Sequence, residues 1–395
     1  MLLFTPGPTP IPESIRQAMA TPTLHHRTKE FEAIFAKTKA GLKLMLNMPE
    51  VLLLASSGTG AMEACLLSLT TSKILTINCG KFGERWGKIA KAHNIAYQEI
   101  KHEWDTPPSV EEVLEAIKAD SSIDAIALQV CESAGGLRLD IESIAKSIKQ
   151  HNSSIMIIAD AITAMGVEKI DTTHIDALIG GSQKAFMLPP AMSIIGLSSK
   201  AIERIEERNL GLYFNLAIEL KNQRKNTTAW TAPTTITQGL LKYFEIVESM
   251  GAKKLGKDSF IQNPSEFDTQ ALQAGIQAVY EHSKKLSLST QAALKALGLP
   301  LYPKSPAIAM SAVYDKENAV KIRSELKALG VNVAAGQDHI KEQIFRINHM
   351  GLIEAYEAAW VINALEIALD RLGLRVFDGA GNKAFMQEFY GISQI

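Results

Sequence analysis

The chain of 395 residues is 46% hydrophobic and 21% charged, and it carries a formal net charge of −1. This composition is typical of a soluble globular protein, and the length allows two domains with cores of their own. The near-zero charge argues against a nucleic-acid surface and against binding to an anionic membrane.

The cysteines and the N-terminal residues indicate the cellular compartment in which the protein is expected. Cys65, Cys79 and Cys131 form no CxxC pair, so neither a disulfide framework nor a metal cluster is expected. The apolar start, residues 1–4, is too short for the apolar region of a signal peptide. No run approaches the roughly 20 apolar residues of a membrane span. We expect a cytoplasmic protein that binds no metal and no membrane.

Between about residues 50 and 200, short apolar runs alternate with stretches of helical periodicity. The runs predict strands at residues 51–55, 74–78, 123–130, 154–159, 175–179 and 193–197. With amphipathic helices between them, as at 110–119 and 141–150, they predict a mainly parallel, doubly wound sheet. Ligands bind at the carboxyl ends of such strands. Polar or aromatic residues follow nearly every run: Ser57, Lys81, Phe82, Glu132, Ser133, Asp160 and Lys184.

The second half of the chain has a different pattern. Helices are predicted at residues 201–208, 237–249, 275–296, 317–329 and 353–372, and strands at 308–314 and 343–347. The polar stretch 251–270 is predicted to be a surface insertion or an irregular loop. We therefore predict five parts: an N-terminal segment 1–20, a large domain 21–250, the insertion 251–270, a small α/β domain 271–376 and a tail 377–395.

Lys184 follows a predicted strand, and Asp160 ends the strand before it. A lysine beside a buried carboxylate is the pair that pyridoxal phosphate (PLP) requires, because the lysine holds the cofactor as a Schiff base and the carboxylate keeps its pyridine nitrogen protonated. The pattern therefore predicts a PLP site. The alternative for Asp160 is a cap of a helix starting near Ala161.

The turn Ser57-Gly58-Thr59 lies between a predicted strand and a helix start. Glycine lets the backbone approach a phosphate closely, and the helix N-terminus supplies partial positive charge. The stretch matches neither a Walker A loop nor the GxGxxG fingerprint. Beside Lys184 and Asp160, it is the expected seat of the cofactor phosphate. Such turns also cap helices that bind no ligand.

Two further side chains are candidates for contacts in the site. Phe82 can stack on the face of a planar ring or serve as a core phenylalanine. Arg346 lies in an apolar, strand-like segment, where a permanent charge is costly unless it is paired. A substrate carboxylate suits its planar fork, and the alternative is a structural salt bridge. His26 and Arg27 are the next candidates to hold a carboxylate.

Together these residues resemble the class V aminotransferases of PLP fold type I, particularly the alanine-glyoxylate and serine-glyoxylate (serine-pyruvate) group. The resemblance covers most of the chain. Its most specific part is Gly181-Ser182-Gln183-Lys184-Ala185 followed by Leu188-Pro189-Pro190. Its other parts are Thr5-Pro6-Gly7-Pro8, His25-His26-Arg27, Ser57-Gly58-Thr59, Gly80-Lys81-Phe82-Gly83, Glu132-Ser133, Asp160-Ala161 and residues 345–351.

The resemblance implies a large doubly wound domain, a small C-terminal α/β domain and a homodimer with shared active sites. It implies a ping-pong transfer of an amino group from a small amino acid, alanine or serine, to glyoxylate or pyruvate. It assigns the Schiff base to Lys184, the pyridine nitrogen to Asp160 and the ring hydroxyl's surroundings to Ser133. It implies that the cofactor phosphate is bound by Gln183, Ser57, Gly58 and Thr59, and by Thr228 and Thr231 of the partner subunit.

Some positions depart from the family pattern. Phe82 stands where alanine-glyoxylate members usually have tryptophan, and Ala134-Gly135-Gly136 replaces the common Ser-Thr-Gly. These differences bear on the substrate rather than on the cofactor. Residues 251–270 and 378–395 have no counterpart that the resemblance places.

Other classes of protein remain as alternatives. A cysteine desulfurase needs a nucleophilic cysteine well after the lysine, and all three cysteines precede Lys184. Family members have been labelled as a small hydrogenase subunit, but the chain has no cysteine-rich cluster or nickel motif. A non-catalytic binding protein would not need Lys184, Asp160 and Arg346 together. Another fold type I enzyme, such as a phosphonate or aspartate aminotransferase or a lyase, is the remaining alternative.

Overall fold

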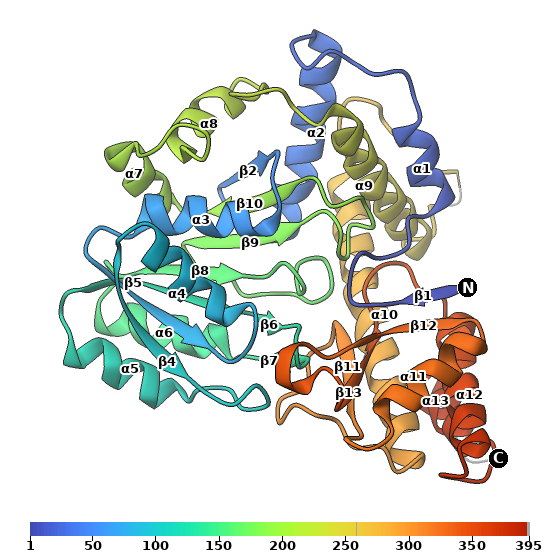
Figure 1. The fold of residues 1–395 in the computed structure, drawn as a ribbon. Helices are drawn as coiled ribbons and strands as arrows, with labels where there is room; N and C mark the ends of the chain where they lie inside the picture. The colour runs from blue at the N-terminus through green and yellow to red at the C-terminus, as the bar shows by residue number, and fades with distance from the viewer. Residues whose placement is uncertain (258, 393–395) are drawn as a thin grey trace.

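The computed structural model of the protein describes residues 1–257 and 259–392. A seven-stranded sheet in the order β2-β10-β9-β8-β5-β3-β4 forms the centre of its larger part (Figure 1). Strand β10 runs antiparallel to both neighbours, and the other neighbouring pairs are parallel. The predicted mainly parallel sheet is confirmed. The strands are β2 (Glu50–Leu54), β3 (Lys73–Asn78), β4 (Ala96–Lys101), β5 (Ile123–Gln129), β8 (Met156–Asp160), β9 (Ala177–Gly181) and β10 (Ser193–Leu197).

Two hydrophobic cores cover the two faces of this sheet. Alternate residues of β2 separate between them, because Val51 and Leu53 join one core and Leu52 and Leu54 the other. One core includes side chains of α2 (Lys29–Leu46), α5 (Val110–Ala119), α6 (Ile141–His151) and α9 (Thr234–Lys254). The other includes side chains of α3 (Gly58–Leu69), α4 (Gly83–Ala92), α7 (Ser199–Arg208) and α8 (Leu216–Gln223). The sheet is therefore doubly wound.

Strand β4 was not among the predicted strands. It forms the edge of the sheet and pairs only with β3. Most of its side chains face solvent, and Ile100 is its one buried residue. Without an apolar run, the hydrophobic pattern gives no signal for a strand at this position.

A second, four-stranded sheet has the order β1-β12-β13-β11 (Figure 1). The N-terminal strand β1 (Leu2–Phe4) pairs with β12 (Val331–Ala335), so the start of the chain joins the C-terminal sheet. The other strands are β11 (Met310–Tyr314) and β13 (Ile344–Asn348), close to the predicted positions, whereas β12 was not predicted. The helices are α10 (Thr269–Ala296), α11 (Ala319–Ala328), α12 (Ala355–Arg371) and α13 (Ala380–Tyr390). The smaller elements are α1 (Glu13–Met19), β6 (Cys131–Glu132), β7 (Leu137–Arg138) and the 3₁₀ turn η1 (Asp338–Ile340).

The predicted insertion and tail are partly helical. Helix α9 continues to Lys254, and the described residues between it and α10 form an irregular connection. Helix α13 packs on α10 and α12 through the buried Phe385. Residue 258 of the insertion and residues 393–395 of the tail lie outside the described residues. The boundaries of the five parts stay a prediction.

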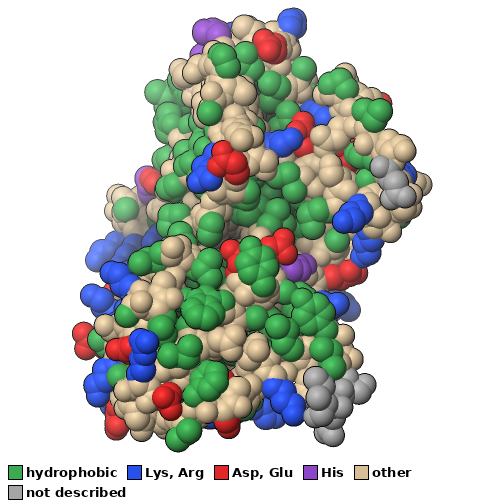
Figure 2. Space-filling model, turned by 90° about the vertical axis from the view of Figure 1, so that its right-hand side faces the viewer, with side chains coloured by type: hydrophobic (Ala, Val, Ile, Leu, Met, Phe, Trp, Pro, Cys, Tyr) green, Lys and Arg blue, Asp and Glu red, His purple; other side chains and the backbone are tan. Residues whose placement is uncertain are grey.

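The view from the side of α9 and α12 shows hydrophobic side chains gathered between the upper and lower halves of the molecule (Figure 2). A cavity of about 220 Å³ lies between the N-terminal segment and residues 350–353, and its lining includes Phe4, Ile11 and Met187. In the described part of the chain, no helix combines the length and the apolar character that a membrane crossing requires.

Helices α9 and α10 touch through two glycines. A Cβ added to Gly251 would lie 1.8 Å from the Ala271 carbonyl oxygen, and one added to Gly275 would lie 1.8 Å from the Val247 oxygen. Neither helix has room for a methyl group at these positions, so the crossing depends on glycine.

We expect Gly251→Ala to lower the free energy of unfolding by roughly 3 kcal/mol or more, because two backbones would have to separate. Gly298→Ala is the control. Its φ of +74° disfavours a side chain, but no atom lies within 4 Å, so the cost should be about 1 kcal/mol. Urea denaturation of both variants measures the difference, and equal losses would contradict the close packing.

Candidate active site

A cavity of about 320 Å³ opens at the carboxyl ends of strands β8 and β9. The predicted site residues that line it are Ser57, Gly58, Thr59, Phe82, Ser133, Asp160, Gln183 and Lys184. Arg346 lies next to this group because its guanidinium donates to the Ser133 carbonyl oxygen. The sheet therefore brings together residues that are far apart in the sequence.

Lys184 follows strand β9 and faces the cavity beneath the N-terminal segment. Its ammonium donates to the Pro6 carbonyl oxygen, and the Thr9 hydroxyl donates to the Lys184 carbonyl oxygen at 2.7 Å. A Cβ on Gly7 would come within 2.7 Å of the Lys184 side chain, so the segment fits closely over the lysine. Desolvation lowers the pKa of Lys184 to about 8. Part of the lysine population is therefore a neutral, nucleophilic amine near neutral pH.

Asp160 ends strand β8, which lies beside β9 in the sheet. Its carboxylate accepts a hydrogen bond from the Ile162 N–H at 2.9 Å, and burial raises its pKa to about 6. Residues 162–167 form turns and no helix starts at Ala161, so the alternative of a helix cap is wrong. The carboxylate is buried without an ion pair among the described residues, and a cationic group in the cavity would favour its charged form.

The turn after β2 suits a phosphate. Ser57 is the N-cap of α3, yet its hydroxyl makes no capping hydrogen bond. A Cβ on Gly58 would lie 2.1 Å from the terminal methyl group of Ile162, so a larger residue here would have to displace that side chain. The first N–H groups of α3 and the helix dipole therefore point toward the cavity without a protein anion to occupy them.

Glu132 joins the turn that carries Phe82 to the loop that carries Ser133. The carboxylate accepts hydrogen bonds from the N–H groups of Phe82 and Gly83, both at 2.9 Å, and of Ala134 at 3.0 Å. Burial raises the pKa of Glu132 to about 7. Phe82 lines the cavity and belongs to none of the hydrophobic cores of the described chain, which favours the stacking role over that of a core phenylalanine.

Arg346 lies on β13 with only 8% of its surface exposed. Its Nε donates to the Ala335 carbonyl oxygen at 2.7 Å and its Nη1 to the Ser133 oxygen. Burial lowers the pKa of Arg346 to about 10. The guanidinium forms no ion pair with any described residue, so the alternative of a structural salt bridge is wrong within that part of the chain.

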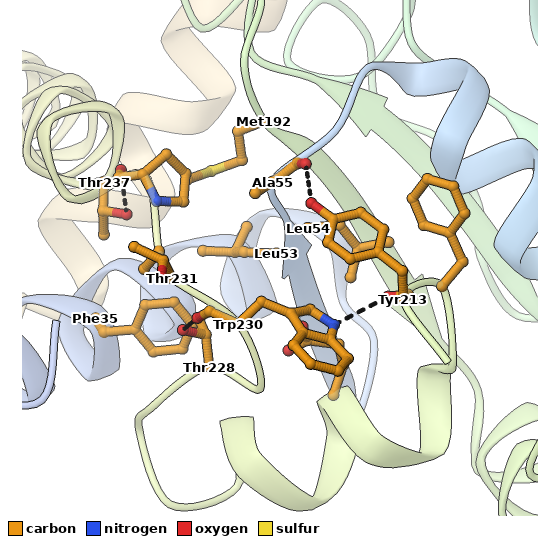
Figure 3. Close-up of a pocket in the computed structure, with 14 residues that line it drawn as sticks. Phe35, Leu53, Leu54, Ala55, Met192, Tyr213, Thr228, Trp230, Thr231 and Thr237 are labelled. Atoms are coloured by element: carbon orange, nitrogen blue, oxygen red, sulfur yellow. Dashed lines mark hydrogen bonds between the residues drawn. The ribbon is translucent and has the colours of Figure 1, made fainter. Parts of the chain in front are cut away.

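Thr228 and Thr231 lie elsewhere. Both line a separate pocket with Phe35, Tyr213 and Trp230 (Figure 3). The Thr228 hydroxyl donates to the Trp230 carbonyl oxygen at 2.5 Å, and the Trp230 ring N–H donates to the Tyr213 carbonyl oxygen at 3.1 Å. Within one chain these threonines do not reach the cavity beside Lys184, so their predicted contact with a phosphate requires a second chain.

The cavity also has lining residues that the sequence analysis did not single out as contacts. They are Gly7, Pro8, Arg85, Cys131, Ile162, Thr163 and Pro190. Arg85 gives a detectable signal, because it lies three residues after Phe82 and so on the same side of a helix start. The others face the cavity through turns whose shape a periodic pattern does not reveal.

The comparisons with known proteins agree with this site. Residues 2–350 match the model of the family described as aminotransferase class-V, so the chain belongs to this family. The family and its structural relatives establish the fold as PLP fold type I, the cofactor as PLP and the activity as that of an aminotransferase.

An uncharacterized aminotransferase of Helicobacter pylori is 52% identical over 99% of this chain and 100% of its own. A soluble hydrogenase small subunit of Synechococcus is 34% identical, over 96% of both chains. A serine–glyoxylate aminotransferase of Methylorubrum extorquens is 25% identical, over 96% of this chain and 93% of its own. The structure of a Thermus thermophilus aspartate aminotransferase of subgroup IV superposes with a TM-score of 0.82 at 26% identity, over 94% of this chain and 99% of that one.

The residues around the cavity fit PLP. Lys184 would hold its aldehyde carbon, Asp160 its pyridine nitrogen, and the turn of Ser57, Gly58 and Thr59 its phosphate. When bound, PLP supplies an electron sink for negative charge at the substrate Cα. Asp160 would keep that sink effective only as a carboxylate, and the ring nitrogen would be the cation that its buried position favours.

We expect Lys184→Ala to abolish turnover while the fold stays intact, because the lysine both holds PLP and moves the proton at Cα. Transaminase assays and circular dichroism measure the two effects. Lys149→Ala is the control, since Lys149 is a partly buried lysine paired with Asp176 outside the cavity. Substantial activity in Lys184→Ala would contradict the assignment of Lys184 as the PLP-binding lysine.

We expect Asp160→Asn to retain some bound PLP and to lose most of its activity, because a neutral amide no longer holds the ring nitrogen protonated. The visible absorption band of the bound cofactor and the turnover rate separate the two effects. Near wild-type rates would show that the carboxylate serves only the Ile162 turn.

Proposed function

We propose that the protein transfers an amino group from alanine or serine to glyoxylate or pyruvate in two successive half-reactions, the ping-pong pattern. The observation that carries the proposal is Arg346. A buried guanidinium without a carboxylate partner among the described residues, hydrogen-bonded to a cavity residue, is suited to an amino acid and to a 2-oxo acid alike.

The chain's own residues have separate tasks in this reaction. Arg346 binds the α-carboxylate and so fixes the rotation of the substrate about its Cα. The Lys184 amine, with its lowered pKa, accepts the proton from the substrate Cα. It would then donate this proton to the cofactor carbon that receives the amino group. Glu132 keeps the Phe82 turn and the Ser133 loop at a fixed separation.

The size of the cavity supports a small substrate. About 320 Å³ is near the lower end of the roughly 300–1,000 Å³ of ligand pockets, and PLP takes part of it. The loop after Ser133 is confined, since a Cβ on Gly135 would lie 2.9 Å from both the Trp104 carbonyl oxygen and the Tyr302 ring. The serine–glyoxylate relative supports the same substrate class.

A panel of amino donors against glyoxylate and pyruvate tests the proposal. Alanine or serine should give the highest kcat/KM. The aspartate aminotransferase of Thermus thermophilus makes aspartate the informative competitor. A strong preference for aspartate, or turnover by elimination without any 2-oxo acid, would replace the proposal with one of the alternative fold type I activities.

A cytoplasmic homodimer with shared active sites completes the proposal. Thr228 and Thr231 lie away from the cavity of their own chain and line a pocket with Tyr213, which is 48% exposed. Apolar side chains exposed next to polar groups of this kind are typical of an interface between subunits. Sedimentation equilibrium measures the association directly.

We expect Arg346→Ala to lower kcat/KM by ~30- to 1000-fold, because a bidentate pair in a partly dry site contributes on the order of 2–4 kcal/mol. Arg346→Lys should recover only part, since an ammonium lacks the planar fork. The kcat/KM values for the amino donor and for the 2-oxo acid should fall together, while PLP stays bound.

Arg138→Ala is the matched control for this prediction. Arg138 is a partly buried arginine paired with Glu142 and Glu168, so its loss should reduce stability rather than substrate affinity. If Arg346→Ala instead lost PLP or unfolded with unchanged substrate kinetics, the carboxylate would have to bind elsewhere, with His26 and Arg27 the next candidates.

A further inference from the structure

Arg85 connects two walls of the cofactor cavity. It lies in the first turn of α4, and its side chain lines the cavity. The Nη1 atom donates to the Thr59 hydroxyl at 3.0 Å, and the guanidinium carbon lies 4.8 Å from the centre of the Phe82 ring. One side chain therefore reaches both the first turn of α3 and the Phe82 ring just before α4.

Arg85 is close enough to Asp160 to act on that carboxylate electrostatically, but the two side chains do not form an ion pair. Arg85 makes no ion pair with any described residue, although its helix neighbour Glu84 pairs with Lys88. A cation held at a cavity wall without an ion-pair partner is suited to an anionic ligand.

Among the charged side chains of the cavity, Arg85 is needed to balance the negative charge of the PLP phosphate. The charged side chains that line the described cavity are Arg85, Asp160 and Lys184. The Lys184 nitrogen would be taken up in its bond to the aldehyde carbon, and Asp160 would be matched by the ring nitrogen. A phosphate monoester carries about −1.5 to −2 charges near pH 7. Among these lining side chains, Arg85 is the one cation left to oppose that charge.

We propose that Arg85 is a binding residue for the phosphate group of the cofactor, acting together with the Thr59 hydroxyl that it holds and with the N-terminus of α3. This inference rests on the PLP site and not on the identity of the amino donor. Arg85 thus adds full positive charge to a turn whose other contributions are neutral hydroxyl and backbone N–H groups.

The test compares PLP with pyridoxal, which has the same ring and aldehyde but no phosphate. Both ligands are titrated into the apoprotein, and binding is followed by the visible absorption band and by equilibrium dialysis. We expect Arg85→Met to weaken PLP binding by about 10- to 100-fold. Pyridoxal binding should stay within about 3-fold of wild type, and inorganic phosphate should compete with PLP less effectively than in wild type.

Two controls make the result interpretable. Lys88→Met removes a positive charge from the exposed side of the same helix, so it should leave the preference for PLP over pyridoxal unchanged. Arg85→Lys keeps the charge and should keep most of that preference. If Arg85→Met fails to fold, Arg85→Gln compared with Arg85→Lys carries the same test.

The outcomes are distinct. A loss that affects PLP but not pyridoxal supports the proposal. Equal losses for both ligands, or no loss for either, overturn it and leave Arg85 as a residue that only holds Phe82 and Thr59. Since no amino acid is present in these titrations, failure of the proposed donor and acceptor would leave the result unaffected.

Discussion

Charge that is removed from water without a partner is the constraint on which this active site depends. Burial moves the pKa of Lys184 down to about 8, that of Asp160 up to about 6 and that of Arg346 down to about 10. Each shift is toward the neutral form and so marks a free-energy cost in the folded protein. A cofactor with an aldehyde and a cationic ring nitrogen, together with a substrate carboxylate, would relieve all three costs.

Backbone carbonyl groups make this arrangement tolerable. Lys184 donates to the Pro6 oxygen, and Arg346 donates to the oxygens of Ser133 and Ala335. A carbonyl dipole stabilises a cation without cancelling its charge, so the Arg346 guanidinium stays available to an anion. Glu132 is the reverse case, since three N–H groups satisfy a buried carboxylate beside these cations.

The sequence was sufficient to predict the elements that carry strong apolar runs, and with them the side chains at the ends of those strands. Lys184 and Asp160 follow β9 and end β8, so their proximity is a consequence of two parallel strands being neighbours. Strand β4 is exposed, and β1 pairs with residues more than 300 positions away, so no local pattern reveals either. Arg85 was missed for a related reason, because its role depends on Thr59, which belongs to another strand end.

The four-stranded sheet is connected to two residues of the candidate active site, Lys184 and Arg346. Strand β1 leads directly into Pro6 and Gly7, which cover Lys184, while β12 supplies the Ala335 oxygen that holds Arg346 on β13. Strands β1 and β12 are paired, so the segment over Lys184 and the backbone that holds Arg346 share one hydrogen-bonded frame. The N-terminal strand therefore joins the segment that covers Lys184 to the sheet that carries Arg346, and this accounts for its place in a sheet formed otherwise by C-terminal strands.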